Sequence, residues 1–482
     1  MFCQKTIVSK ITYPLFLLRH GRHGTFRHLR ALRKLDFRRE AESDIKSRQR
    51  DLLTNILQYA FDHSCWYRKR FIDSGIKRED LHLPNVLQSL PVVTRVELRE
   101  NMEEILSDEI PREKMLRSKT GGSTMEPLMF YRDGNVLDYR MAFELLLNEE
   151  AGWKIGEPWV NFWGHLDDIP DEEVARKLKY TIANGLSRRM IPYNATFLDE
   201  DKLMELAQRI REKRPTWVFG YPRAIATFAR FAIKESIDLP PVRGVLVTAE
   251  PTPPEDHDAI ERCFGVRALD RYASREVGMV SQECSAHRGL HIMTDNVFVE
   301  FLDHGQGQVE SESIKRIVVT DLHNRAMPLI RYETDDVASP LERPAEDCGC
   351  CFSGMPLMSH VGGRVTDMFI RKDGSWFTGL DVPGMRMAET GWVNQIQYIQ
   401  TGIDEVTVRI VKGAQFNDDV MPYLQKEVDD VFVSSVRLTP EFVDKIEKTK
   451  SGKFMYSIRT IPEEELRRIT NAPAPGSSTS GK

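Results

Sequence analysis

Residues 242–265 read VRGVLVTAEPTPPEDHDAIERCFG, and this stretch contains the pattern that decides the fold. Its first part, residues 242–248, is a compact apolar run of the kind found in buried strands. Residues 254–264 then predict a helix. Thr252 and Glu255 have the spacing of a capping box, a proline stands in the first turn, and Gly265 supplies the stop. A buried strand followed by a loop and a helix predicts an α/β architecture.

The same alternation extends along the chain. Residues 217–219 predict another strand, and residues 45–75 have a helical stripe that we expect to pack in the core. The stripe consists of Leu52, Leu53, Ile56, Leu57, Ala60 and Phe61. In an α/β domain with buried sheets, ligands bind at the loops beyond the strand ends. We therefore look for functional residues in those loops.

The pattern changes near residue 365, where a small α+β module begins. Residues 396–400 and 405–411 predict a hairpin, residues 418–432 an amphipathic helix, and residues 436–438 a further strand. The tail is rich in proline, serine and glycine, which predicts disorder. The expected division is an N-terminal extension (1–45), a large domain (46–363), a small mobile domain (364–465) and a disordered tail (466–482).

Composition excludes several classes of protein. The chain has 482 residues and a net charge of −5, so no overall basic field favours binding to nucleic acid or to an anionic membrane. Seven cysteines, clustered late, do not resemble a secreted disulfide framework, so we expect a cytoplasmic protein. Residues 13–18 are apolar but too few to span a membrane. We expect them to dock on the large domain, with peripheral membrane contact as the alternative, and we expect no transmembrane segment.

A glycine-rich loop, SKTGGSTMEP, occupies residues 118–127 and precedes a strand-like run at 128–131. Its backbone N–H groups and hydroxyls could cradle phosphate oxygens. A Walker-type loop would need Gly-Lys-Ser/Thr followed by a helix, and both are missing. Taken alone, the loop fits an ordinary hairpin connection equally well.

Four further motifs follow in order: RYASREVG (271–278), RYETDDV (331–337), GRVTD (363–367) and KSGK (450–453). Together with the glycine-rich loop, the chain resembles the phenylacetate–CoA ligase/CapK-like branch of the adenylate-forming (AMP-binding) superfamily. Further stretches agree: LPVVT (90–94), FGYP (219–222), TAEP (248–251) and residues 319–332. The resemblance covers about residues 52–461. It implies a large N-terminal adenylation domain of layered sheets and helices, followed by a small mobile α+β domain.

The resemblance implies an AMP-forming ligase that uses ATP and Mg²⁺ to activate a small carboxylic acid as its acyl-AMP, with release of pyrophosphate and transfer to CoA. The molecular partners would be that acid and an acceptor, without nucleic acid; a homodimer stays open. One alternative is an adenylating transferase that passes the acyl group to an amine, a sugar or a carrier protein. Another is a catalytically degenerate nucleotide-binding protein.

The resemblance also implies roles for individual residues. Lys453 would be the mobile catalytic lysine, Glu276 the catalytic ligand of Mg²⁺, Asp336 the ribose-binding carboxylate, and Arg364 a second ribose contact at the hinge. The phosphate loop would be Thr120, Gly121, Gly122, Ser123 and Thr124. Adenine would be lined by Ala249, Glu250, Pro251, Tyr272, Ala273 and Ser274. The acyl pocket would include Trp163, His165 and Tyr221, whose aromatic rings suit an aryl acid; plain core packing is the alternative.

Cysteines and histidines suggest a structural metal site. Cys284 and His291 are followed about sixty residues later by Cys348 and Cys350, and three cysteines with one histidine can hold tetrahedral Zn²⁺. His287 and Cys351 could substitute. The resemblance implies such a site as well, because some members of the family have cysteines and a histidine in corresponding places. Free thiols and a packed histidine are the alternative.

Three residues depart from the family pattern. Met125 and Asp335 stand where the phosphate loop and the ribose motif usually have glycine, and Thr366 stands where the hinge commonly has aspartate or lysine. Glycine permits backbone conformations that other residues resist. We therefore expect altered loop geometry or ATP affinity at these places.

Overall fold

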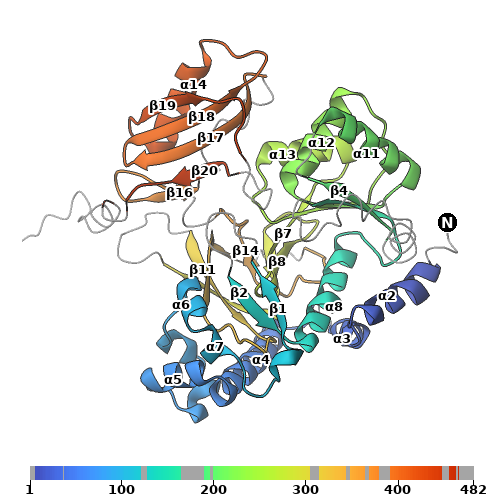
Figure 1. Cartoon of the computed structure of the whole chain (residues 1–482), viewed down its shortest axis with the longest axis vertical. Coiled ribbons are helices and arrows are strands. Elements are labelled where there is room, and N and C mark those ends of the chain that lie inside the picture. The colour runs from blue at the N-terminus through green and yellow to red at the C-terminus, as the bar shows by residue number, and fades with distance from the viewer. Residues whose placement is uncertain are drawn as a thin grey trace, which may run out of the picture. The chain divides into compact units, whose positions relative to one another are not determined.

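A computed structural model describes residues 6–35, 37–38, 40–120, 128–163, 189–195, 199–303, 314–342, 348–363, 368–378, 391–447, 455–462 and 465 (Figure 1). The chain forms two compact units. The first comprises Met1–Glu300, Val318–Thr334 and Pro340–His360. The second comprises Phe301–Ile317, Asp335–Ser339 and Val361–Lys482. The mixed α/β architecture agrees with the expected fold class.

The first unit is built on a nine-stranded sheet in the order β13-β14-β9-β8-β7-β6-β5-β3-β4. The half from β4 to β7 is parallel, and the half from β7 to β13 is antiparallel. The parallel strands are β3 (Trp159–Trp163), β4 (Met190–Asn194), β5 (Trp217–Gly220), β6 (Gly244–Thr248) and β7 (Leu269–Ser274). The others are β8 (Gly278–Glu283), β9 (Leu290–Ile292), β13 (Pro340–Leu341) and β14 (Leu357–Met358).

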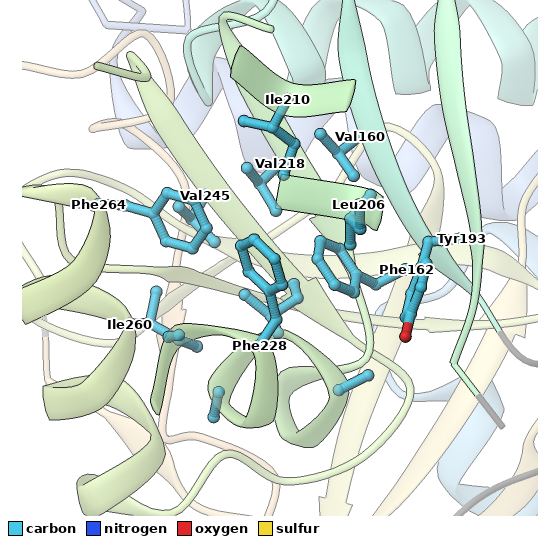
Figure 2. Close-up of a cluster of buried hydrophobic side chains, with 14 of the residues drawn as sticks. Val160, Phe162, Tyr193, Leu206, Ile210, Val218, Phe228, Val245, Ile260 and Phe264 are labelled. Atoms are coloured by element: carbon cyan, nitrogen blue, oxygen red, sulfur yellow. The ribbon is translucent and has the colours of Figure 1, made fainter. Parts of the chain in front are cut away.

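Both faces of the parallel half are buried. Val218, Val245 and Val247 face α11 (Glu200–Lys213), α12 (Pro222–Lys234) and α13 (Pro254–Phe264). Figure 2 shows this core around Phe228, whose ring centroid lies 5.6 Å from that of Phe162. The alternate residues Trp217 and Leu246 pack in a second cluster with α8 (Gly134–Glu150). Burial on both faces explains why these strands read as continuous apolar runs.

The N-terminal helices dock on the first unit, with α3 (Thr25–Leu32) packed against α8. Together with α3, η1 (Val8–Thr12) and α2 (Tyr13–Arg19) bury Val8, Tyr13, Leu17, Leu29 and Leu32 in the second cluster. The docking of residues 13–18 is therefore as expected. No described helix is long and apolar enough to cross a membrane.

The helical stripe of residues 45–75 belongs to two helices, α4 (Glu42–His63) and α5 (Cys65–Asp73). The break falls at Ser64, whose hydroxyl caps α5 by accepting a hydrogen bond from the Tyr67 N–H. The next elements are η2 (Arg78–His82), η3 (Val86–Ser89), α6 (Arg95–Glu100), α7 (Met102–Ile105), η4 (Arg112–Lys114), β1 (Leu116–Lys119) and β2 (Met129–Arg132). A three-stranded sheet has the order β10 (Val297–Leu302), β11 (Lys315–Asp321), β12 (Tyr332–Ala338).

The predicted helix at residues 254–264 is confirmed, but its predicted cap is wrong. Gly265 ends α13 with φ of 69°, as expected. At the start, Pro253 is the N-cap and provides no side-chain hydrogen bond. The Thr252 hydroxyl instead donates to Asp270 Oδ1 at 2.7 Å, so the capping box does not form.

The second unit contains the predicted α+β pattern. β17 (Val393–Gly402) and β18 (Glu405–Lys412) form the hairpin, with β19 (Arg437–Phe442) and β20 (Ser457–Arg459) at the outer edges of the sheet. α14 (Val420–Phe432) packs Leu424 and Val428 against Val408 and Ile410. A short hairpin of β15 (Met368–Ile370) and β16 (Trp376–Thr378) adds Phe369 and Phe377 to this core.

Candidate functional site

The strand order creates a binding edge at the carboxyl ends of β3 and β5. These two strands are parallel neighbours, yet the chain continues from β3 to β4 on one side and from β5 to β6 on the other. Such a change of direction leaves a crevice beyond the strand ends, where α/β proteins bind ligands. Sequence reasoning placed ligands at strand ends, and the topology now selects this pair of strands.

Two of the three predicted acyl-pocket residues meet at this edge. Trp163 ends β3, Tyr221 directly follows β5, and their ring centroids lie 4.6 Å apart. Tyr221 belongs to the buried core, and Trp163 packs against it while staying partly exposed. Between them, Gly220 has φ of 148°, and a Cβ there would lie 2.1 Å from the Phe162 carbonyl oxygen, so only glycine fits. His165 lies outside the described residues.

The two predicted adenine segments lie at the same edge. Residues 249–251 directly follow β6, and residues 272–274 end β7. β6 and β7 are parallel neighbours, and the Thr248 hydroxyl donates to the Arg271 carbonyl oxygen at 2.8 Å. All six side chains are partly exposed. Ala249 has φ of 78°, a conformation that costs an alanine about 1–2 kcal/mol. Such strain is found at functional sites.

Glu276 lies in the turn between β7 and β8 and is 6% exposed. Its Oε1 accepts hydrogen bonds from Arg95 Nη2 at 3.3 Å and from the Tyr332 hydroxyl at 3.4 Å. The predicted metal ligand therefore has a cationic neighbour. Sequence reasoning missed Arg95, although it directly follows the LPVVT stretch.

The glycine-rich loop connects a hairpin. β1 and β2 are antiparallel, and Thr120 closes their ends: its N–H donates to the Leu128 carbonyl oxygen, and its hydroxyl accepts from the Leu128 N–H, both at 2.9 Å. Arg275 Nη1 donates to the Lys119 carbonyl oxygen at 3.4 Å, so the hairpin is tied to the turn that carries Glu276. Gly121, Gly122, Ser123, Thr124 and Met125 lie outside the described residues.

Several arginines lie at this junction, of which Arg140 is buried and Arg132 is partly buried. Arg140 donates to the Glu276 carbonyl oxygen at 2.9 Å and pairs with Asp321, while Arg132 on β2 donates to the Ser118 hydroxyl at 3.1 Å. Burial, together with the positive charges of Arg140 and other arginines nearby, lowers the pKa of Arg132 to about 10. Arg132 remains charged at neutral pH, and this concentration of positive charge suits a polyanion.

The remaining predicted nucleotide residues belong to the second unit or lie outside the described residues. Asp336 lies on β12 within the second unit, whereas Arg364, Thr366 and Lys453 lie outside the described residues. Asp335 has φ of 64°, the left-handed conformation that glycine adopts freely and aspartate tolerates better than most residues. The backbone shape expected of a glycine is thus kept at residue 335.

The preferred cysteine–histidine set forms one cluster. The ligand atoms of Cys284, His291, Cys348 and Cys350 all lie within 4.8 Å of one another. His291 Nε2 is 3.6 Å from Cys348 Sγ and 3.5 Å from Cys350 Sγ. The two substitutes lie elsewhere.

Neither His287 nor Cys351 is among the four clustered ligands. His287 instead pairs with the Glu283 carboxylate at 3.0 Å. Within the cluster, the thiol of Cys350 and the imidazole of His291 lower the pKa of Cys284. The hydrogen bond between the thiols of Cys350 and Cys284, together with burial, raises the pKa of Cys350. Three sulfurs and one imidazole nitrogen, partly or fully buried and close together, fit tetrahedral zinc.

Comparison with known proteins confirms the resemblance. Residues 370–460 match the family model of the CapK C-terminal domain. Protein CapK of Staphylococcus aureus is 22% identical over 429 residues, covering 87% of this chain and 90% of CapK. The phenylacetate–coenzyme A ligase of Pseudomonas putida is 23% identical over 383 residues, covering 77% and 82% of the two chains.

Solved structures share the fold. A 2-hydroxyisobutyryl-CoA ligase in the postadenylation state, in complex with R3-HIB-AMP, superposes with a TM-score of 0.64 at 18% identity, covering 89% of this chain and 92% of the ligase. The amide bond synthetase McbA from Marinactinospora thermotolerans gives a TM-score of 0.50 at 16% identity, covering 71% and 68%. The fold is therefore that of the adenylate-forming ligases, and it occurs with different acyl acceptors.

Proposed function

We propose that this chain, a relative of CapK and the phenylacetate–CoA ligases, is an AMP-forming ligase that activates a small carboxylic acid with ATP. One carboxylate oxygen attacks the α-phosphorus of ATP, the bond from that phosphorus to the bridging oxygen breaks, and pyrophosphate leaves. The products are acyl-AMP and pyrophosphate. We further propose that the acyl group then passes to CoA.

One observation carries this proposal: the described acyl-pocket residues and the two predicted adenine segments lie at the carboxyl edge of the parallel strands. Trp163 and Tyr221 mark the change of direction between β3 and β5, and the segments 249–251 and 272–274 follow on the next two strands. An aromatic pair suits an apolar or aryl acid, and the neighbouring segments suit a flat base. Acid and nucleotide would thus bind side by side, as in-line attack requires.

The charged residues suit the triphosphate. The reaction brings two anions together, so positive charge fixed beforehand lowers its barrier. Arg132, Arg140 and Arg275 provide such charge beside the hairpin of the glycine-rich loop. The buried carboxylate of Glu276 suits Mg²⁺, which takes one or two protein carboxylates and otherwise binds phosphates and water. When bound, Mg²⁺ would neutralise phosphate charge.

Other assignments rest on the motifs. We propose that residues 121–124 hold the β- and γ-phosphates, Asp336 accepts both ribose hydroxyls, and Arg364 contacts the ribose. Lys453 would place its ammonium between the carboxylate and the α-phosphate, where it stabilises charge that develops in the transition state. His165 would complete the acyl pocket.

Acid-dependent exchange between ATP and labelled pyrophosphate tests the proposal. We expect exchange with at least one member of a panel of aryl and aliphatic acids. Lys453→Ala should lower the exchange rate by about two to three orders of magnitude, as the loss of an oxyanion-stabilising donor does elsewhere. The matched control is Lys445→Ala, which removes a surface lysine paired with Glu447. Adding CoA should then yield acyl-CoA.

Each outcome has one meaning. No exchange with any acid would contradict acyl-AMP formation. Exchange without acyl-CoA would contradict only the transfer to CoA, and would direct the search to amine, sugar or carrier-protein acceptors. An unchanged rate in Lys453→Ala would contradict the role of that lysine.

We also propose that Cys284, His291, Cys348 and Cys350 bind a structural Zn²⁺. Four protein ligands leave no open coordination position, so the ion would stabilise the fold and not take part in the chemistry. The ligands come from the end of β8, from β9 and from residues 348–350, so the ion would join three segments of the antiparallel half of the sheet.

A further inference from the structure

Positive charge is unevenly distributed along the chain. Residues 1–35 contain eight lysines and arginines and no aspartate or glutamate, although the net charge of the whole chain is −5. The eight are Lys5, Lys10, Arg19, Arg22, Arg27, Arg30, Arg33 and Lys34. The whole-chain charge therefore conceals a strongly basic segment, which forms η1, α2 and α3.

A row of apolar side chains lies on the surface of the same segment. Ile7, Ile11, Leu15 and Leu18 are 42%, 54%, 58% and 46% exposed. Their spacings of four, four and three residues place them along one face of a helix. Large apolar side chains exposed in a continuous row mark a surface that contacts another apolar phase.

The other side of these helices is fixed to the first unit. Val8 and Leu17 are almost fully buried, and they pack in one cluster with Leu29 of α3 and Phe143 of α8. Figure 1 shows α2 and α3 beside α8. The apolar row, which consists of Ile7, Ile11, Leu15 and Leu18, is therefore displayed by a docked helix and is not a loose tail that collapses onto itself.

Basic side chains are exposed on the same N-terminal helices as the apolar row. Lys10, Arg19 and Arg27 are exposed, and none of them forms an ion pair with another described residue. Arg33, in contrast, pairs with Glu149. The positive charge of these three residues is thus available to an external anionic partner.

We propose that this face binds the surface of an anionic lipid bilayer. The apolar row would enter the boundary between headgroups and acyl chains, while the basic residues contact anionic headgroups. η1 and α2 have five and seven residues. At about 1.5 Å per residue they extend roughly 18 Å, less than the hydrocarbon thickness of about 30 Å, so the helices would lie in the membrane plane.

The charge pattern favours lipid over protein as the occupant. A second copy of this chain has a net charge of −5, but it or another protein would need an acidic patch that matches the positions of Lys10, Arg19 and Arg27. An anionic bilayer supplies that match everywhere on its surface. This proposal does not depend on the adenylating activity.

Co-sedimentation of the full chain with lipid vesicles tests it. We expect the protein to bind vesicles of phosphatidylcholine with phosphatidylglycerol, to bind phosphatidylcholine alone much less, and to be released by added salt. The double variant Ile11→Gln/Leu15→Gln should lose most binding. Arg19→Gln/Arg27→Gln should weaken the partition coefficient by about fivefold for each removed charge.

Matched controls distinguish binding through this face from nonspecific adsorption of the protein to vesicles. Ile72→Gln changes a side chain that is 60% exposed on α5, and Lys372→Gln/Lys445→Gln removes two exposed charges of the second unit; both should bind vesicles like the native chain. Far-ultraviolet circular dichroism verifies folding. Absence of binding to anionic vesicles, or variants that bind like the native chain, overturns the proposal. So does a lipid-free dimer that Leu15→Gln dissociates, which would assign the row to a second copy.

Discussion

Arg95 and Glu276 form a pair that no single motif reveals, because 181 positions separate them in the sequence. The side chains of Arg95 and Glu276 are 16% and 7% exposed. Little water reaches them, so each charge is stabilised mainly by the other. Motif reasoning could name Glu276, since its surrounding residues are distinctive. It could not name Arg95 as its neighbour or Arg132 as part of the same charged junction, because these contacts exist only once the chain is folded.

We expect Arg95→Gln to destabilise the protein by about 1–3 kcal/mol, because a buried carboxylate loses its cationic partner. Glu276→Gln should cost less, and the double variant should be more stable than the sum of the two losses predicts. Urea denaturation of all four proteins measures this coupling.

The control is Arg437→Gln, which breaks an exposed ion pair with Glu405 and should change stability by less than about 1 kcal/mol. Strictly additive losses in the double variant would show that Arg95 and Glu276 do not stabilise each other.

At the scale of elements, two Thr-x-x-Glu pairs with the same spacing behave differently at the starts of their helices. Thr252 and Glu255 have the capping-box spacing, yet their box does not form, since Pro253 takes the N-cap position and Asp270 binds the Thr252 hydroxyl. Thr94 and Glu97 have the same spacing and do form a capping box at the start of α6. The two pairs share their spacing, and they differ in the prolines at 253 and 254 and in the tertiary contact of Thr252 to Asp270.

Glu97→Gln should destabilise the protein by about 1–2 kcal/mol at neutral pH. Burial opposes ionisation of Glu97, but hydrogen bonds from Thr94 and the guanidinium of Arg70 outweigh it and lower the pKa of this carboxyl group. A lowered pKa contributes stability above the unfolded value of about 4.3, and this contribution is lost as the pH falls through the folded value. The cost of the substitution should therefore shrink in acid, as measured by urea denaturation at both pH values.

Glu405→Gln, at an exposed ion pair, should show almost no change at either pH. A cost of Glu97→Gln that stays constant between neutral and acidic pH would contradict the role of the ionised carboxylate.

Long periodic patterns predicted the secondary structure more reliably than the capping motifs did. The apolar run at 242–248, the helix at 254–264 and the hairpin of the second unit were all predictable, because each is set by local periodicity. The antiparallel half of the large sheet was not, since β9, β13 and β14 have only two or three residues and pair across long sequence separations.

At the scale of the whole molecule, each of the two units has its own hydrophobic core, built from different residues. The first unit buries both faces of its parallel strands, and the second packs α14 on its own sheet. The resemblance could predict a large and a small domain. It could not predict that Phe301–Ile317 and Asp335–Ser339 group with the second unit, because their membership follows from pairing and not from sequence order.

Removal of zinc should therefore act locally. We expect purified protein to contain about one zinc per chain, as a single tetrahedral site requires. In Cys348→Ser, or after chelation, amide hydrogen exchange in β8 and β9 should become at least about tenfold faster, because local stability falls where the ion joined the segments. Exchange in β17 and β18 should not change.

Cys65→Ser is the control, since Cys65 is exposed and outside the cluster. A metal-free protein whose β8 and β9 amides are protected as strongly as in the native preparation would refute the zinc site.

The strand order also dictates when each part of the sheet becomes available during synthesis. Every described strand of the parallel half, and the whole core cluster around Phe228, come from residues 159–274 in one contiguous stretch. This half can assemble as soon as that stretch leaves the ribosome, since domains fold as their residues emerge. The opposite edge must wait for β13 and β14, and the cysteine cluster must wait for Cys350. The edge at the carboxyl ends of β3, β5, β6 and β7 can thus form before the antiparallel half is complete, and the proposed metal would be captured by a chain that is already largely folded.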